Sequence, residues 1–183
     1  MSAHALDAIH LQRLRRIVSC RADQLVLDIN AVYVVGPDKT VKIEAFAVQP
    51  ESLAPNDFDE VFPIRVEVSE EVPRFDRFGE EGLAYRVSAE SVTISRIDLV
   101  RVAVQFPSDQ TLAASTADVH AMGVNIVDCG VLVYTDRGVL VAYQRHPGFG
   151  FHWGHHVSGE LMPLEAALAL VPPPYELVPL ELA

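Results

Sequence analysis

Four of the chain's seven histidines lie in one short stretch, "HPGFGFHWGHH" (146–156), together with its single tryptophan. Neutral imidazole is the commonest protein ligand for transition metals. His152, His155 and His156 could therefore supply three nitrogen ligands to zinc or iron. Such a site would make the protein a metal-dependent enzyme. Its further ligands would come from His146, Asp128 or Glu160.

The spacing of these histidines fits a regular metal site poorly. On a strand, His152 and His156 would share one face while His155 would point to the other. The glycines at 148, 150 and 154 favour neither a strand nor a helix. We therefore expect a glycine-rich aromatic loop that holds no metal or other cofactor, and we keep the metal site as the alternative.

The end of this stretch resembles a metal-binding motif of the cupin family. In "HHVSGE", two histidines precede Glu160 by a few residues, as in that motif. The adjacent pair His155–His156 departs from the family's His-x-His spacing, and too little chain follows for the rest of a cupin barrel. The resemblance therefore stops at these six residues.

A longer stretch, residues 120–171, resembles the first half of a Nudix hydrolase. The features that carry the resemblance are "GVLVYTDRGVLVAYQR", Trp153, Gly154, Glu160 and "LEAALALV". The family's motif continues with an arginine–glutamate pair and further glutamates that hold the metal. Leu168 and Ala169 occupy the first of these places, and the later acids are missing. The resemblance implies a degenerate Nudix-like domain without activity.

Other motifs of nucleotide-binding or nucleophilic enzymes are missing from the sequence. "GFGFHWG" places its third glycine one residue too late for the dinucleotide fingerprint. No serine lies in a GxSxG elbow. Cys20 and Cys129 form no CxxC pair, so we expect two small buried hydrophobes in a cytoplasmic protein. Whether the protein is an enzyme stays open.

Acidic side chains concentrate in residues 51–81, which contain ten acids and three arginines. Residues 1–20 carry three arginines against one aspartate. The net charge of −11 argues against nucleic acids and anionic membranes as partners. We expect a noncatalytic binding or accessory domain, of the inhibitor or immunity type, that engages a basic protein partner. Its contact residues would be Asp57, Asp59, Glu60, Phe75 and Phe78. A solvated face without a partner is the alternative.

The first elements that must position these residues are a helix and a hairpin. Residues 3–18 carry apolar side chains at helical spacing, so Leu6, Ile9 and Leu14 are expected to pack on a sheet. Residues 25–35 alternate as one strand whose buried face would run from Leu25 to Val35. "GPDKT" then predicts a turn at Pro37–Asp38, followed by a second strand.

Further strands follow one another through turns instead of crossover helices. The segments are "FPIRVEV", with Pro63 indicating a sheet edge, "LAYRVS", "VTISRIDLVRVAVQF", "HAMGVNIVD", and two strands joined at "TDRG". A short helix is expected at about 162–171. The apolar tail after "PPPY" should dock on its own sheet or on a second copy, which would give a homodimer.

These patterns predict an α+β fold. It would be a mostly antiparallel β-sheet, curled or sandwich-like, with an N-terminal amphipathic helix and a short C-terminal helix. We expect one globular domain over 1–183, with a subdivision near 107–118 as the alternative. No apolar run is long enough to span a membrane.

Overall fold

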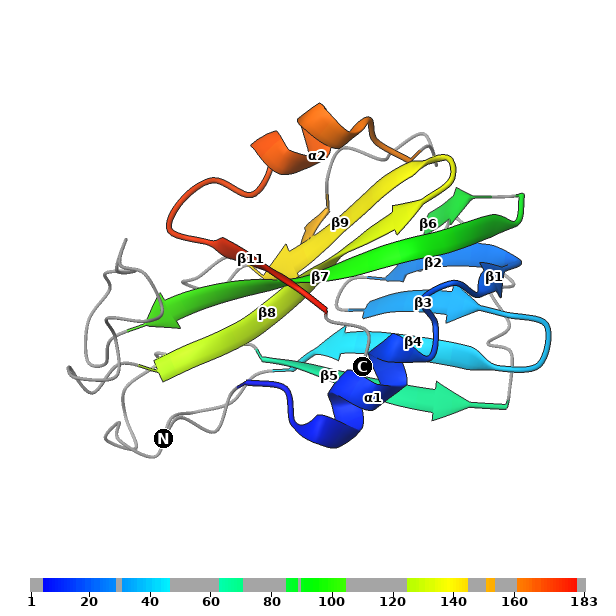
Figure 1. Cartoon of the computed structure of the whole chain (residues 1–183), viewed down its shortest axis with the longest axis horizontal. Coiled ribbons are helices and arrows are strands. Elements are labelled where there is room, and N and C mark those ends of the chain that lie inside the picture. The colour runs from blue at the N-terminus through cyan, green and yellow to red at the C-terminus, as the bar shows by residue number, and fades with distance from the viewer. Residues whose placement is uncertain are drawn as a thin grey trace.

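The structure is a computed structural model that describes residues 5–28, 31–46, 63–70, 85–88, 90–104, 125–144, 151–153 and 161–180. These residues form two antiparallel sheets and two helices (Figure 1). The mostly antiparallel β architecture predicted from the sequence is therefore confirmed, and α+β describes it. None of the helices in the described ranges has the length and apolar character needed to cross a membrane.

The first sheet has five strands in the spatial order β5–β4–β3–β2–β6. Their bounds are β2 Gln24–Asp28, β3 Ala31–Val35, β4 Thr40–Ala45, β5 Ile64–Ser69 and β6 Tyr85–Ser88. β5 lies at one edge, as Pro63 predicts, because a residue without a backbone N–H cannot continue a central ladder. The predicted turn at Pro37–Asp38 is also confirmed, since the Gly36 N–H donates to the Lys39 carbonyl at 2.8 Å.

The single strand predicted over residues 25–35 is wrong. The chain reverses between Asp28 and Ala31, so that β2 and β3 pair with each other and Leu27 lies opposite Val32. Apolar alternation continues through both strands and so gives no sign of the reversal. As a result Leu25 faces the core with Val34, whereas Tyr33 lies on the other face.

The second sheet has six strands in the order β1–β7–β8–β9–β10, with β11 also paired to β7. Their bounds are β1 Arg21–Ala22, β7 Val92–Val104, β8 Asn125–Thr135, β9 Gly138–Gln144, β10 Phe151–Trp153 and β11 Glu176–Pro179. The predicted "TDRG" turn is confirmed by the pairing of Thr135 with Gly138.

β8 is one continuous strand where the sequence indicated two. Val100 of β7 lies opposite Gly130, but the next residue, Arg101, lies opposite Asp128, so Cys129 is an extra residue in the ladder. Such a bulge bends a strand without ending it. The glycine that resembles a strand boundary in the sequence is therefore part of the strand.

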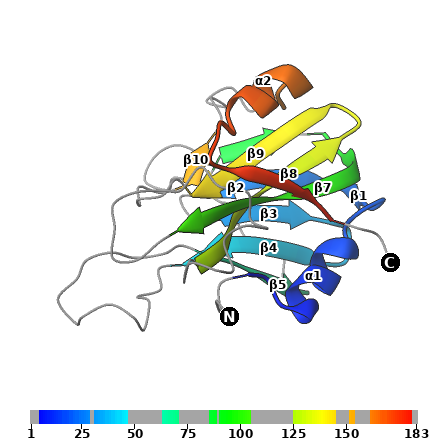
Figure 2. The ribbon, with the colours of Figure 1, turned by 60° about the vertical axis from the view of Figure 1, so that its left-hand side comes forward.

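The two sheets pack face to face around a shared core. In Figures 1 and 2 the strands β7–β9 cross the five-stranded sheet, with α1 next to β4 and β5 and α2 above β9. The core contains apolar side chains from both inner faces, among them Leu25, Val34, Ile43, Ile97, Leu99 and Val133. Burial of these side chains on both sides is what holds the sheets together.

The first helix, α1, spans Ala8–Arg15 and is shorter than the predicted 3–18. Asp7 caps its start by accepting a hydrogen bond from the His10 N–H at 2.9 Å. Leu14 is fully buried, as expected, but Ile9 is 60% exposed, and the prediction that it packs on the sheet is wrong. Five residues correspond to about 140° around a helix, so Ile9 cannot share the narrow buried face of Leu14.

The outer face of the six-stranded sheet is covered by α2 and the residues next to it. The helix α2 (Leu164–Ala169) and its flanking residues pack on β8 and β9. Met162, Ala167 and Val171 from the helix side are buried together with Leu132 of β8 and Tyr143 of β9. The tail continues as β11, in which Val178 pairs with Leu99 of β7. The prediction that the tail docks on its own sheet is confirmed, and pairing with a second copy stays a prediction.

Candidate functional site

Most of the residues predicted to bind a partner or a metal lie outside the described residues. The set comprises Asp57, Asp59, Glu60, Phe75, Phe78, His146, His155, His156 and Glu160. The subdivision expected near 107–118 lies outside them as well. The acidic contact surface and the three-histidine site therefore both stay predictions.

The backbone of His152 is among the described residues. It lies in β10, where it pairs with Tyr143 of β9, so the expected irregular loop is interrupted by a strand. The three residues Phe151–Trp153 contain no glycine, which explains why a strand can form within a glycine-rich stretch. Among the described residues, no three His, Cys, Asp or Glu side chains gather as metal ligands would.

Asp128, suggested above as a further metal ligand, is engaged in a buried ion pair. Its two carboxylate oxygens accept hydrogen bonds from Nε and Nη2 of Arg101 at 2.7 and 3.1 Å. The backbone N–H of Leu6 donates to the same carboxylate at 2.8 Å. The hydrogen bonds with Asp128 raise the pKa of Arg101 despite its partial burial. Asp128 thus ties the start of the chain to β7 and β8.

A second buried carboxylate, Asp98, forms a network that was not predicted from the sequence. Arg96 donates to it through Nε at 2.6 Å and Nη2 at 2.8 Å, and the Tyr134 hydroxyl donates at 2.7 Å. Burial, together with the bond to Asp98, raises the pKa of Tyr134 to about 12. Residues two apart on a strand share a face, so the Arg96–Asp98 pair could have been predicted from spacing.

The two cysteines have opposite environments. Cys129 is buried as predicted, and burial followed by the charge of Asp128 raises the pKa of its thiol, so that the thiol stays protonated. Cys20 is exposed, and the prediction that it is buried is wrong. It follows the end of α1, and its Sγ donates to the Arg16 carbonyl at 3.0 Å.

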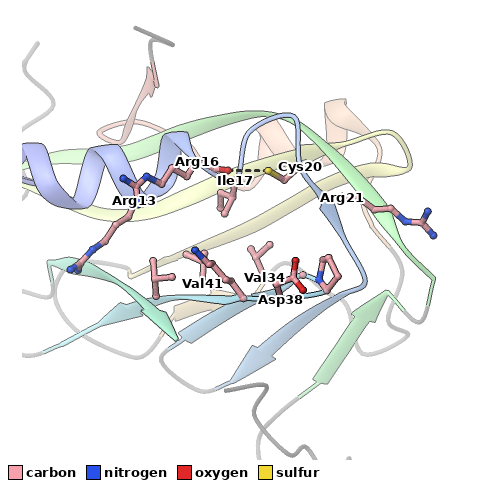
Figure 3. Close-up of a pocket in the computed structure, with 12 residues that line it drawn as sticks. Arg13, Arg16, Ile17, Cys20, Arg21, Val34, Asp38 and Val41 are labelled. Carbon is pink, nitrogen blue, oxygen red and sulfur yellow. Dashed lines mark hydrogen bonds between the residues drawn. The ribbon is translucent and has the colours of Figure 1, made fainter. Parts of the chain in front are cut away.

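Cys20 lies at a pocket of about 230 Å³ between the end of α1 and the β3–β4 turn (Figure 3). We call it the basic pocket. Its lining consists of Arg13, Arg16, Ile17, Cys20, Arg21, Val34, Gly36, Pro37, Asp38, Lys39, Val41 and Val68. The basic start of the chain is visible in the sequence. Its approach to Lys39 and Val68 is a product of the fold.

Comparison of the chain with protein-family models, with curated proteins and with solved structures found no match. The cupin and Nudix resemblances therefore rest on the sequence motifs alone.

Proposed function

We infer that the protein is a noncatalytic binding domain that engages a basic protein partner through its acidic segment, residues 51–81. In this proposal Asp57, Asp59 and Glu60 attract the partner, and Phe75 and Phe78 anchor it. Charges at an interface mainly accelerate encounter, while buried aromatic side chains hold the complex together. An accessory or inhibitor-like protein would act in this way.

The observation that carries the proposal is the pairing of carboxylates within the two sheets. Glu44 lies 2.7 Å from Lys42 Nζ and 2.6 Å from Arg65 Nη2. Asp98 pairs with Arg96 and Asp128 with Arg101, and in the connections between strands Glu90 pairs with Arg137. The net charge of −11 is carried chiefly by the acidic segment, which contains ten acids and three arginines.

Among the described residues, the buried and half-buried titratable side chains support a role without catalysis. The pKa values of the Cys129 thiol and the Tyr134 hydroxyl are raised, so neither loses its proton near neutral pH. The carboxylates of Asp98 and Asp128 are held by arginines and accept structural hydrogen bonds. We place the protein in the cytoplasm, where Cys20, an exposed free thiol, would stay reduced.

The test compares two charge-neutralised proteins with the wild type. One carries Asp57→Asn, Asp59→Asn and Glu60→Gln. The matched control carries Asp23→Asn, Glu90→Gln and Glu165→Gln, which removes three exposed acids outside the acidic segment. Proteins captured from the native host at low and high salt are identified by mass spectrometry, and the purified partner is then studied by surface plasmon resonance.

We expect the acidic-segment variant to associate more slowly and with a weaker dependence on salt, while the control matches the wild type. Phe75→Ala or Phe78→Ala should instead accelerate dissociation. A partner that binds all these proteins with unchanged rate constants would contradict the proposal, and the acidic segment would then be a solvated face. The same conclusion would follow if the wild type captured no protein in a salt-dependent manner.

A further inference from the structure

We propose that the basic pocket binds a small amphiphilic anion, with a carboxylate or phosphate head group on a short hydrocarbon body. This site is separate from the acidic segment, and it would stand if the proposed protein partner did not exist. Three features carry the inference, namely an apolar floor that is open to water at Val68, a local reversal of charge and a rim that is fixed at Arg13 and Cys20.

The apolar floor exists because α1 ends before it has covered the inner face of the five-stranded sheet. Val68 of β5 lies opposite Val41 of β4 on the core-facing side. Val41 is 5% exposed, whereas Val68 is 42% exposed. Ile17 and Val34 complete the floor and are buried. A hydrocarbon body placed here would remove the exposed surface of Val68 from water, which is favourable.

The size of the pocket fits a body of several carbon atoms. Its volume is about 230 Å³, whereas an apolar cavity of about 150 Å³ is enough to hold benzene. In Figure 3, Ile17 reaches into the hollow from the side of α1, and Val34 and Val41 lie across from it on the sheet. The hydrocarbon body would lie between these two layers.

The charges around the pocket are opposite in sign to those of the whole protein. Arg13, Arg16, Arg21 and Lys39 line it, against one acidic side chain, Asp38, in the lining. The chain as a whole has a net charge of −11. Guanidinium groups present paired donors that match the oxygens of carboxylates and phosphates. An anionic head group is therefore the complement of this rim.

The end of a helix carries partial negative charge, which would oppose an anion. Here Cys20, in the turn after α1, donates hydrogen bonds to two carbonyls near the end of the helix. The Arg16 carbonyl accepts from Cys20 Sγ at 3.0 Å, and the Ile17 carbonyl accepts from the Cys20 N–H at 3.2 Å. These bonds reduce the negative potential that the helix end presents to the pocket.

One part of the rim, Arg13 with the backbone of Ser19 and Cys20, is held in place before any ligand binds. The Arg13 guanidinium donates to the Val66 carbonyl at 2.6 Å. Ser19, between α1 and β1, adopts a left-handed backbone conformation with φ of 67°. Its N–H donates to the Ile94 carbonyl at 2.6 Å, and the Ile94 N–H donates to the Cys20 carbonyl at 3.0 Å. This part of the rim therefore loses little entropy on binding.

Isothermal titration calorimetry of the full chain with octanoate and with octyl phosphate tests the proposal. Octanol supplies the hydrocarbon body without charge, while acetate and inorganic phosphate supply the head groups alone. We expect saturable one-to-one binding of at least one amphiphilic anion and weaker binding of all three fragments. The stronger ligand identifies the head group as a carboxylate or a phosphate ester, and either result supports the site.

Variants locate the binding. The double variant Arg16→Gln with Lys39→Gln should weaken binding about tenfold, equivalent to about 1.4 kcal/mol. The control Arg15→Gln with Arg137→Gln removes the same charge from residues that do not line the pocket, and it should bind like the wild type. Val68→Glu places a negative charge at an exposed position of the lining and should abolish binding.

Methyl NMR spectra should show ligand-induced shifts at Ile17, Val34, Val41 and Val68. Melting curves establish that each variant is folded. The proposal is overturned if neither amphiphilic anion binds in a saturable manner, or if octanol binds as tightly as the anions. It is also overturned if the double variant binds like the control, or if the shifted methyl groups lie elsewhere.

Discussion

At the residue scale, Gly130 is the position where the six-stranded sheet has no room for a side chain. A Cβ atom there would overlap the Cβ of Tyr143 and the carbonyl oxygen of Ala142. Tyr143 is fully buried, and its hydroxyl donates to the Leu170 carbonyl at 2.6 Å. Because Tyr143 is packed on one side and hydrogen-bonded at its tip, it cannot move away.

We therefore expect Gly130→Ala to lower the free energy of unfolding by about 3 kcal/mol or more, at the upper end of overpacking costs. Urea denaturation monitored by circular dichroism measures the loss. Gly36→Ala is the matched control, because its Cβ would come no closer than 3.2 Å to the Lys39 carbonyl. Equal losses in the two variants would show that Gly130 is not specially crowded.

At the scale of the element, α1 contributes to stability through one of its faces only. Leu14→Ala should lower the free energy of unfolding by about 2–5 kcal/mol, since it leaves a cavity in the shared core. Ile9→Ala, on the 60% exposed side of the same helix, should change it by less than about 0.5 kcal/mol. Thermal or urea unfolding of both variants gives the comparison, and similar losses would contradict the assigned orientation.

The ion pairs of Glu44 connect β4 with the edge strand β5 and make stability depend on pH. Burial raises the pKa of Glu44, but the hydrogen bonds that Lys42 and Arg65 donate outweigh it and hold the pKa below the ordinary value of 4.5. The unfolded chain therefore binds a proton at a higher pH than the folded protein does. The stabilisation is present above about pH 4.5 and is lost as the pH falls through the folded pKa.

Urea denaturation at several pH values between about 3 and 6 should show this loss, with a shallower decline for Glu44→Gln. The control Glu165→Gln removes an exposed carboxylate of α2 and should follow the wild-type profile. An unchanged acid limb in Glu44→Gln would mean that another group governs the decline.

At the scale of the whole molecule, the sequence predicted those features of the fold that depend on neighbouring residues only, such as turns. Pro37–Asp38 and "TDRG" form turns wherever they lie between strands, so both hairpins were predictable. The reversal between Asp28 and Ala31 was not, because β2 and β3 carry the same alternation. The basic pocket was not predictable either, because Arg13, Lys39 and Val68 meet only after the two sheets have formed.

The strands that pair with β7 are translated at different times. One edge of β7 is covered by two segments that are far apart in the chain. Residues 19–22 pair with its beginning, and residues 176–180 pair with Ile97–Arg101. The first segment has already been translated when β7 leaves the ribosome, but the second follows much later. At about 5–20 residues per second, translation from Arg101 to Glu176 takes roughly 4–15 s.

During that interval the Ile97–Arg101 half of the edge has open backbone donors and acceptors, the kind of surface on which neighbouring nascent chains pair and aggregate. The time for which this edge of β7 stays open therefore depends on the rate of translation. Slow translation between β7 and β11 would lengthen the exposure and lower the yield of folded protein, although every contact in the finished molecule would be the same.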